Sequence, residues 1–135
     1  MRNRVELTSR NERLFQFAKS IASLSDYGKF HHGAVLTKHG AILNYSHNKD
    51  KPCSFGGRFR CKSLGQATLH AELGAILNMP RESTEDADIY VVRINSDGEY
   101  KNSKPCDMCQ EAMRFCGVKR VFYSTEYGHF EVMKL

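Results

Sequence analysis

The sequence lacks the features of membrane, secreted and multidomain proteins. No apolar run approaches the length of a membrane span, and the first four residues, Met1-Arg2-Asn3-Arg4, are too polar for a secretory signal. Internal repeats, low-complexity tracts and long proline- or glycine-rich linkers are absent. We therefore expect one intracellular, cytoplasmic domain over residues 1–135 that does not contact a membrane.

The cysteines are few and do not suit a disulfide framework. There are five, an odd number, which agrees with a reducing compartment. Only Cys106 and Cys109 have the Cys-x-x-Cys spacing, so a zinc ribbon would lack its second half. A redox dithiol is a further alternative for this pair, but it explains neither His70 nor Glu72. Cys53 and Cys61 could bind a second metal or simply be buried, and we favour burial. We interpret Cys116 as a small hydrophobic side chain that faces the core.

Composition otherwise suits a globular domain with anionic partners. The chain has 135 residues, of which 41% are hydrophobic, enough to bury a core. Its formal net charge is +5. This charge favours phosphorylated nucleotides and nucleic acids equally, so it does not choose between them.

One group of residues has the chemistry of a catalytic zinc site. If a helix begins near Pro105, Cys106 and Cys109 emerge from one face of its first turn, where the helix dipole favours thiolates. With His70 they supply three of four tetrahedral ligands and leave the fourth to water. Glu72 follows the histidine too closely to be a comfortable second ligand. It is placed to carry protons to and from that water.

Together, His70-Ala71-Glu72 and Pro105-Cys106-x-x-Cys109 resemble the signature of the zinc-dependent cytidine and deoxycytidylate deaminase superfamily. The resemblance implies a hydrolase in which zinc lowers the pKa of its water, and the resulting hydroxide attacks the ring carbon that bears the exocyclic amine. Glu72 would shuttle the proton to the ring nitrogen and assist the departure of ammonia.

Hydrophobic periodicity predicts the order of helices and strands. Three helices are expected, one from a cap at Ser9 to Leu24, one capped by Thr68 and running to Asn78, and one over 106–116 that stops at Gly117. The expected strands are 34–36, 41–43, 89–94, 118–123 and 130–132. The short segment 124–128 can join the last two strands only as an antiparallel hairpin. With the resemblance, this predicts a three-layer α/β/α fold with a mixed five-stranded sheet.

The resemblance also suggests substrate contacts. Family members place an asparagine after the second strand to hold the sugar, and Asn48 matches that position better than Asn44. The backbone at Ala71 would face the base. Shaping a turn is the alternative role for Asn48.

Two loops complete the expected substrate site. Tyr100 and Ser103, just ahead of the cysteines, are candidates to line it, together with Asn102. The irregular segment 49–67 is basic and aromatic, and we expect Arg58 and Arg60 in it to hold phosphate. A solvated surface loop is the alternative.

These features predict hydrolytic deamination of a cytosine nucleoside or nucleotide, with conversion of deoxycytidylate to deoxyuridylate as the first choice. A deaminase of cytosine or adenine in single-stranded DNA or RNA is an alternative. A catalytically inactive, zinc-stabilised nucleic-acid-binding module is another, although Glu72 argues against it. Relatives carry terminal helices that this chain lacks, so we also expect a homo-oligomer.

Overall fold

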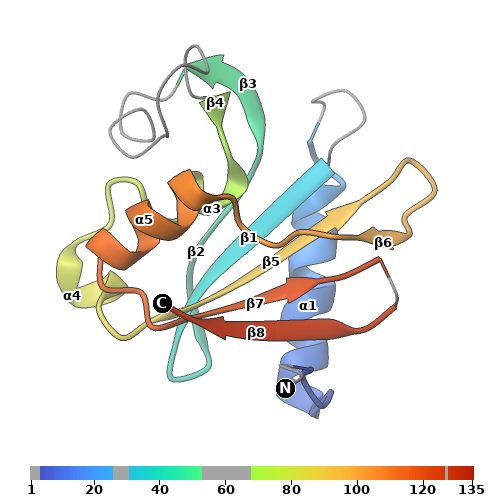
Figure 1. The fold of residues 1–135 in the computed structure, drawn as a ribbon, viewed down its shortest axis with the longest axis horizontal. Coiled ribbons are helices and arrows are strands. Elements are labelled where there is room, and N and C mark those ends of the chain that lie inside the picture. The colour runs from blue at the N-terminus through green and yellow to red at the C-terminus, as the bar shows by residue number, and fades with distance from the viewer. Residues whose placement is uncertain (1–3, 26–30, 53–67, 127) are drawn as a thin grey trace.

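The computed structural model describes residues 4–25, 31–52, 68–126 and 128–135 (Figure 1). In chain order its elements are α1 (Ser9–Ala22), β1 (His31–Lys38), β2 (Ala41–His47), β3 (Lys49–Pro52), β4 (Thr68–Leu69), α3 (Ala71–Ile76), α4 (Arg81–Thr84), β5 (Asp88–Ile94), β6 (Tyr100–Lys101), α5 (Asp107–Phe115), β7 (Arg120–Ser124) and β8 (Phe130–Lys134).

The main sheet is mixed and has β5 at its centre. Its strands lie in the order β2-β1-β5-β7-β8, and the short β6 pairs with β5 beside this path. Only the β5–β7 pair is parallel; the other pairs in the sheet are antiparallel. The predicted mixed α/β sheet is confirmed, with β6 as an additional two-residue strand.

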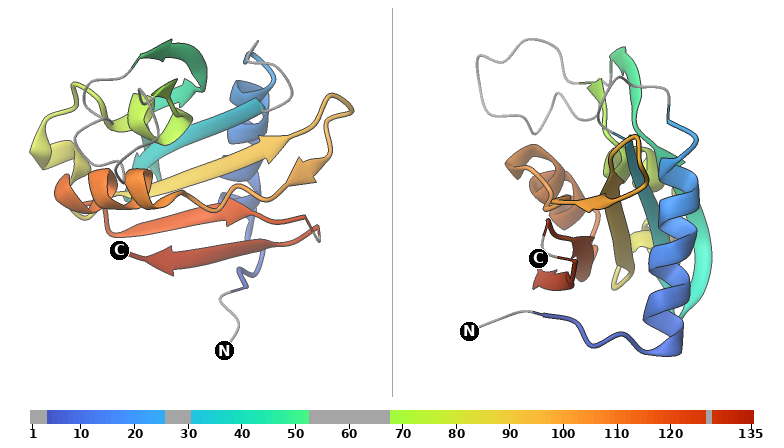
Figure 2. Two further views of the ribbon diagram at one scale, coloured as in Figure 1. Left: turned by 45° about the horizontal axis from the view of Figure 1, so that its top comes forward. Right: turned by 90° about the vertical axis from the view of Figure 1, so that its right-hand side faces the viewer.

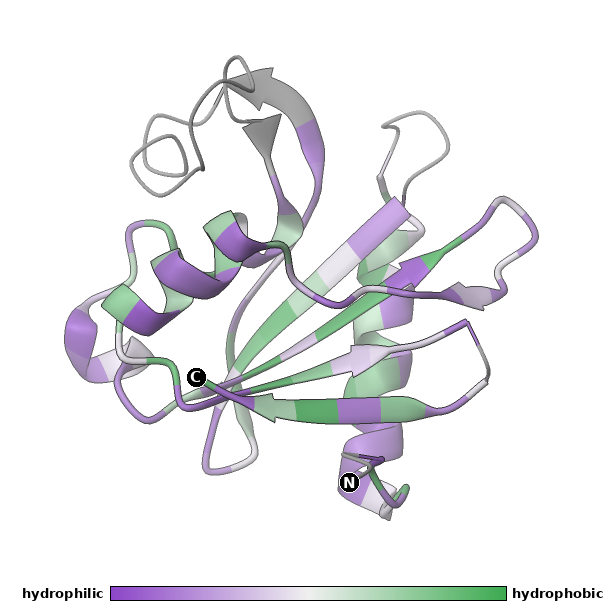
Figure 3. Cartoon of the chain, viewed as in Figure 1, coloured by the Kyte–Doolittle hydropathy of each residue, from purple (hydrophilic) through white to green (hydrophobic). Residues whose placement is uncertain are grey.

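Helices cover both faces of the sheet and make three layers. Figure 2 shows α1 on one side of the strands and α5 on the other. One buried cluster joins α1 to the sheet through residues such as Phe15, Val35 and Phe122. The second joins α3 and α5 to the opposite face through residues such as Leu73, Met113 and Val91. Much of the central strand β5 is accordingly coloured hydrophobic in Figure 3.

Helix α1 forms because its apolar residues recur on one face. Leu14, Phe15 and Ala18 are buried against the sheet, and polar residues occupy the outer face. The hydroxyl of Thr8 accepts a hydrogen bond from the backbone N–H of Asn11 at 3.2 Å. The predicted cap at Ser9 is therefore wrong by one residue, because Thr8 makes the capping bond.

Both predicted hairpins are present. Strands β1 and β2 meet at a turn in which His39 and Gly40 have positive φ values of 54° and 82°. Two successive positive φ values are the requirement of the type I′ turn that suits twisted strands. Strands β7 and β8 pair antiparallel from Arg120–Lys134 to Ser124–Phe130, as the short connection between them requires.

The second predicted helix is shorter than expected. Thr68 does not cap it, because Thr68 and Leu69 form β4 and pair with β3. His70 takes the N-cap position instead and α3 begins at Ala71. The helix ends at Ile76, and Asn78 adopts a left-handed φ of 64° that cannot continue it. Tertiary pairing thus overrides the local capping signal.

Helix α5 ends as the sequence predicts. Its last turn is closed at Gly117, whose φ is 86°, and the N–H of Val118 donates to the carbonyl of Met113 at 3.0 Å. This is the bond of a Schellman motif, which needs a left-handed residue after the helix. Cys116 is the C-cap and packs against the core, as expected for an unligated side chain. Among the described helices, none is both long and apolar enough to span a membrane.

Helix α1 crosses β1 at Gly33 with no room for a side chain. A Cβ at Gly33 would overlap the carbonyl oxygen of Ala18 and lie 2.5 Å from the backbone nitrogen of Ala22. Since neither backbone atom can move alone, we expect Gly33→Ala to lower the free energy of unfolding by about 3 kcal/mol. Urea denaturation measures this directly.

The matched control is Gly98→Ala, which is strained but not crowded. Gly98 has a φ of 81°, and the nearest atom to an added Cβ is Lys19 Cε at 3.9 Å. Left-handed strain alone should cost about 1 kcal/mol. A Gly33→Ala protein as stable as the control would show that α1 does not press on β1 as described.

Candidate metal and active site

The site lies where the N-termini of α3 and α5 face each other on one side of the sheet. His70 is the N-cap residue of α3, and Cys106 is the N-cap residue of α5. Cys109 lies in the first turn of α5 and is fully buried. Chain segments far apart in the sequence therefore bring the three predicted ligands together.

The three ligand atoms are close enough for one ion. His70 Nδ1 lies 3.3 Å from Cys109 Sγ and 3.8 Å from Cys106 Sγ. All three atoms lie within 4.8 Å of one another. Tetrahedral zinc, with bonds of about 2.0–2.3 Å, separates its ligand atoms by about 3.3–3.8 Å. The donor set and its spacing therefore fit zinc, and among the described residues this is the one His/Cys/Asp/Glu group with such spacing.

The two thiols differ in acidity. The pKa of Cys106 is lowered to about 4 by its hydrogen bond with Cys109 and by the one with His70, although burial opposes the shift. The pKa of Cys109 is raised by the same contact with Cys106 and by its burial. The hydrogen bond with Cys106 raises the pKa of His70. Cys106 is thus the thiolate of the group, and a bound cation favours deprotonation of both sulfurs.

Glu72 is buried beside the ligands. Its side chain is 5% exposed and belongs to the first turn of α3. Burial raises its pKa, while the charge of His70 acts in the opposite direction. A raised pKa makes a carboxylate a stronger proton acceptor than an ordinary one. This is the property that a proton shuttle needs.

Asn48 joins three segments through its side-chain amide. Its Oδ1 accepts hydrogen bonds from the backbone N–H of His32 at 2.9 Å and from the hydroxyl of Ser25 at 2.7 Å. The residue follows β2 directly and is buried. Asn44 is engaged elsewhere, since its Nδ2 donates to the carbonyl of Ala75. Asn48 thus braces the start of β1, and its contact with a sugar stays a prediction.

The other predicted contacts fall in different places. Ala71 is buried at the start of α3, between His70 and Glu72. The Tyr100 ring packs edge-on against Phe130 at 5.1 Å, in the cluster under α1. It lies on the face of the sheet opposite the metal ligands, so we do not retain it as a substrate contact.

Ser103 also differs from its expected role. Its side chain is 3% exposed, and its hydroxyl bonds to β5 and β7 rather than facing an opening. We therefore do not retain the Ser103 side chain as a substrate contact. Arg58 and Arg60 lie outside the residues that the structure describes.

His32 is a neighbour of the site that sequence analysis did not single out. Its pKa is lowered to about 4, first by burial and then by the charges of Arg93 and His70. His32 pairs with Arg93 across β1 and β5. Alternation along β1 could have revealed it, because Ala34 and Leu36 of the same strand face α3 and α5. His32 is therefore neutral at physiological pH.

Three residues that could hold a metal ion and a buried carboxyl, placed at two helix N-termini, make a candidate zinc site in an α/β fold. The family model described as the cytidine and deoxycytidylate deaminase zinc-binding region matches residues 8–125. That match spans most of the sequence, so the chain belongs to the cytidine and deoxycytidylate deaminase family. No curated protein matches the chain.

Solved structures share the fold. The dCMP deaminase of cyanophage S-TIM5 in apo form is 22% identical, with a TM-score of 0.63, over 87% of this chain and 84% of that chain. Its complex with dCMP and dUMP is 24% identical, with a TM-score of 0.62, over 88% and 83%. The cytidine deaminase of Burkholderia pseudomallei is 20% identical, with a TM-score of 0.63, over 95% and 93%. At these identities the likeness establishes the fold alone.

The ligand assignment predicts which cysteines hold metal. Cys106→Ser and Cys109→Ser should each reduce bound zinc from about one equivalent to a small fraction, because hydroxyls are poor zinc ligands. Cys116→Ser, at the other end of α5, should retain it. Zinc per chain after dialysis, measured by mass spectrometry, tests this. A Cys109→Ser protein with stoichiometric zinc would refute the assignment.

Proposed function

We propose that the chain is a zinc-dependent enzyme that hydrolytically deaminates the cytosine base of a nucleotide, with deoxycytidylate as substrate and deoxyuridylate as product. The observation that carries the proposal is the burial of Glu72 beside His70, Cys106 and Cys109. A structural zinc site does not need a buried carboxyl beside three ligands, whereas a hydrolase needs a group to move protons.

In this proposal the metal ligands and Glu72 divide the work. His70, Cys106 and Cys109 hold zinc, which when bound acts as a Lewis acid and lowers the pKa of water. The carboxylate of Glu72 takes a proton from the attacking water and gives it to the ring nitrogen of the base. The same carboxyl then takes the remaining proton of the hydroxyl that has added to the ring carbon and gives it to the exocyclic amine. The C–N bond breaks, ammonia leaves and the added oxygen becomes the carbonyl of the product.

The choice of a phosphorylated substrate follows from charge. The chain carries a net charge of +5, which attracts anions. The cyanophage structure that holds dCMP and dUMP is an example of this fold with a nucleotide bound. Within the proposal, Asn48 contacts the sugar, the backbone at Ala71 faces the base, and Arg58 and Arg60 hold the phosphate.

Glu72→Gln tests the proton shuttle. The amide keeps the shape of the side chain but cannot take up a proton. We expect ammonia release to fall by about 100-fold or more while bound zinc is unchanged. Initial rates of ammonia release and zinc content, measured on the same preparations, provide the two readouts.

The matched control is Glu82→Gln on α4. Glu82 is exposed, and its backbone carbonyl accepts a bond from Lys38 Nζ at 2.7 Å. The Glu82→Gln variant should release ammonia at the rate of the unmodified protein. Equal rates for Glu72→Gln and the unmodified protein would remove Glu72 from the mechanism.

A substrate panel tests the choice of deoxycytidylate. Zinc-loaded protein should release ammonia fastest from deoxycytidylate, compared with cytidine, deoxycytidine, cytidylate, guanine, adenosine and a single-stranded cytosine oligonucleotide. Activity on the oligonucleotide alone would instead make this a strand deaminase. No activity from folded, zinc-loaded protein would favour a nucleic-acid-binding module.

A further inference from the structure

The segment that leads into the metal site is held down by buried hydroxyls. Between β6 and α5 the chain crosses the ends of β5 and β7 as an extended strap, residues 102–106 (Figure 1). An irregular segment this close to the core must satisfy its backbone polar groups. The N–H of Ser103 bonds to the carbonyl of Ser124 on β7, and these two serines are 3% and 0% exposed.

The two serines form a dense network with the backbone of three elements. Ser103 Oγ bonds to the carbonyl of Val91 at 2.9 Å and accepts the N–H of Ser124 at 2.8 Å. Ser124 Oγ donates to the carbonyl of Lys101 at 2.7 Å and accepts the N–H of Arg93 at 3.2 Å. The two hydroxyl oxygens lie 2.8 Å apart. We call Ser103 and Ser124 the hydroxyl clamp.

A short, restrained backbone segment links the hydroxyl clamp to Cys106. The N–H of Ser103 donates to the carbonyl of Ser124 at 2.9 Å, which fixes the strap against β7. Only Lys104 and Pro105 separate Ser103 from Cys106. Pro105 has a fixed φ, and its carbonyl accepts a bond from Gln110 Nε2 of α5 at 2.7 Å. Because the two intervening residues have little freedom to adjust, a displacement of Ser103 would also displace Cys106.

We propose that the Ser103–Ser124 hydroxyl clamp is a positioning device for the metal site, which fixes Cys106 at the distance from His70 that zinc requires. Ser103 thus acts on the metal through Cys106 rather than on the substrate. Groups that orient metal ligands typically affect metal affinity by about 10–100-fold.

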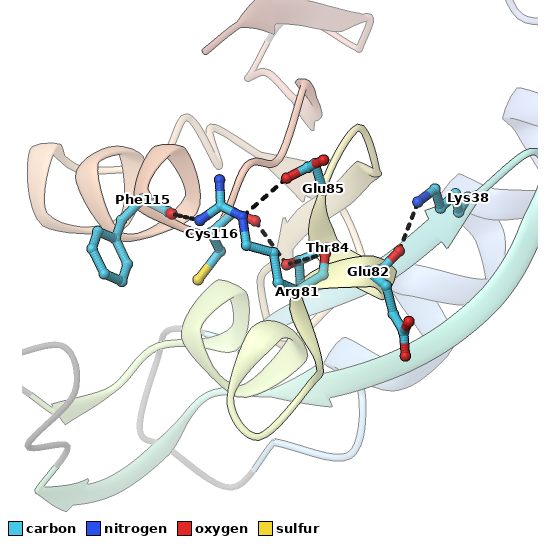
Figure 4. A network of polar contacts seen from close by, with 7 residues as sticks. All are labelled: Lys38, Arg81, Glu82, Thr84, Glu85, Phe115 and Cys116. Carbon is cyan, nitrogen blue, oxygen red and sulfur yellow. Dashed lines mark hydrogen bonds and ion pairs between the residues drawn. The ribbon is translucent and has the colours of Figure 1, made fainter.

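The other end of α5 offers a matched comparison. There Thr84, which is 1% exposed, donates its hydroxyl to the carbonyl of Cys116 at 2.7 Å. Arg81 donates to the carbonyl of Phe115 at 2.9 Å and pairs with Glu85 at 3.0 Å (Figure 4). These contacts also anchor α5 through a buried hydroxyl, but at the end away from the metal ligands.

The test compares Ser103→Ala with Thr84→Val, each of which removes one buried hydroxyl. Both should lower the urea midpoint, since each leaves a buried backbone group unsatisfied. Only Ser103→Ala should weaken zinc, by about 10-fold or more in competition with a chromophoric chelator. Thr84→Val should stay within about twofold of the unmodified protein. Ser103→Thr, which keeps a hydroxyl, should restore most of the affinity.

Cobalt substitution gives a second readout that does not depend on turnover. The visible absorption of tetrahedral Co²⁺ reports ligand geometry, so Ser103→Ala should change it and Thr84→Val should not. If Ser103→Ala does not fold, Ser124→Ala removes the same hydroxyl pair from the β7 side and should weaken zinc likewise. Equal losses of affinity in the Ser103 and Thr84 variants, or none in a folded Ser103→Ala protein, would overturn the proposal.

Discussion

The parallel pairing of β5 with β7 decides where the metal site can form. Parallel neighbours cannot be joined by a tight turn, so the chain must leave the end of β5, cross one face of the sheet and return to the start of β7. Helix α5 makes that crossing after the chain has run back along β5, where Ser103 bonds to the carbonyl of Val91 in the middle of that strand (Figure 1). Helix α3 packs beside α5 on the same face, which brings His70 to Cys106 and Cys109. The ligand set is a result of topology.

Burial then gives the assembled groups their chemical character. Of the four groups of the site, Cys109 and Glu72 are buried, His70 is half-buried and Cys106 is exposed, so uncompensated charge is unfavourable chiefly at Cys109 and Glu72. Two helix N-termini offset part of that penalty with aligned N–H dipoles. The remaining charge on the sulfurs suits a divalent cation, and the carboxyl of Glu72 is left with a raised pKa. One environment thus favours metal at the sulfurs and a transferable proton at Glu72.

The local sequence pattern predicted the helices and strands well, but it predicted their tertiary contacts less well. The helices at 9–22 and 107–115, the two hairpins and the central strand follow from apolar spacing and turn chemistry. The motif spacing also indicated that His70, Cys106 and Cys109 would lie together, as they do. The error at Thr68 has another origin, because its pairing with β3 depends on residues distant in sequence. The packing of Tyr100 in the cluster under α1 was not predictable either, because its neighbours in sequence do not say which face of the sheet it joins. Position along the chain likewise cannot show that Ser103 is buried.

The strand order has a consequence for the order in which the protein assembles. Central strand β5 receives β1 from far earlier in the chain and β7 from the far side of α5, so the middle of the sheet depends on long-range contacts. Such contacts close large loops and form slowly compared with helices and hairpins. The candidate metal ligands lie at the starts of α3 and α5. The placement of these two helices relative to each other depends on the central strands of the sheet. Along a refolding time course, the ability to hold metal should therefore emerge with the completed tertiary structure and not with its first elements.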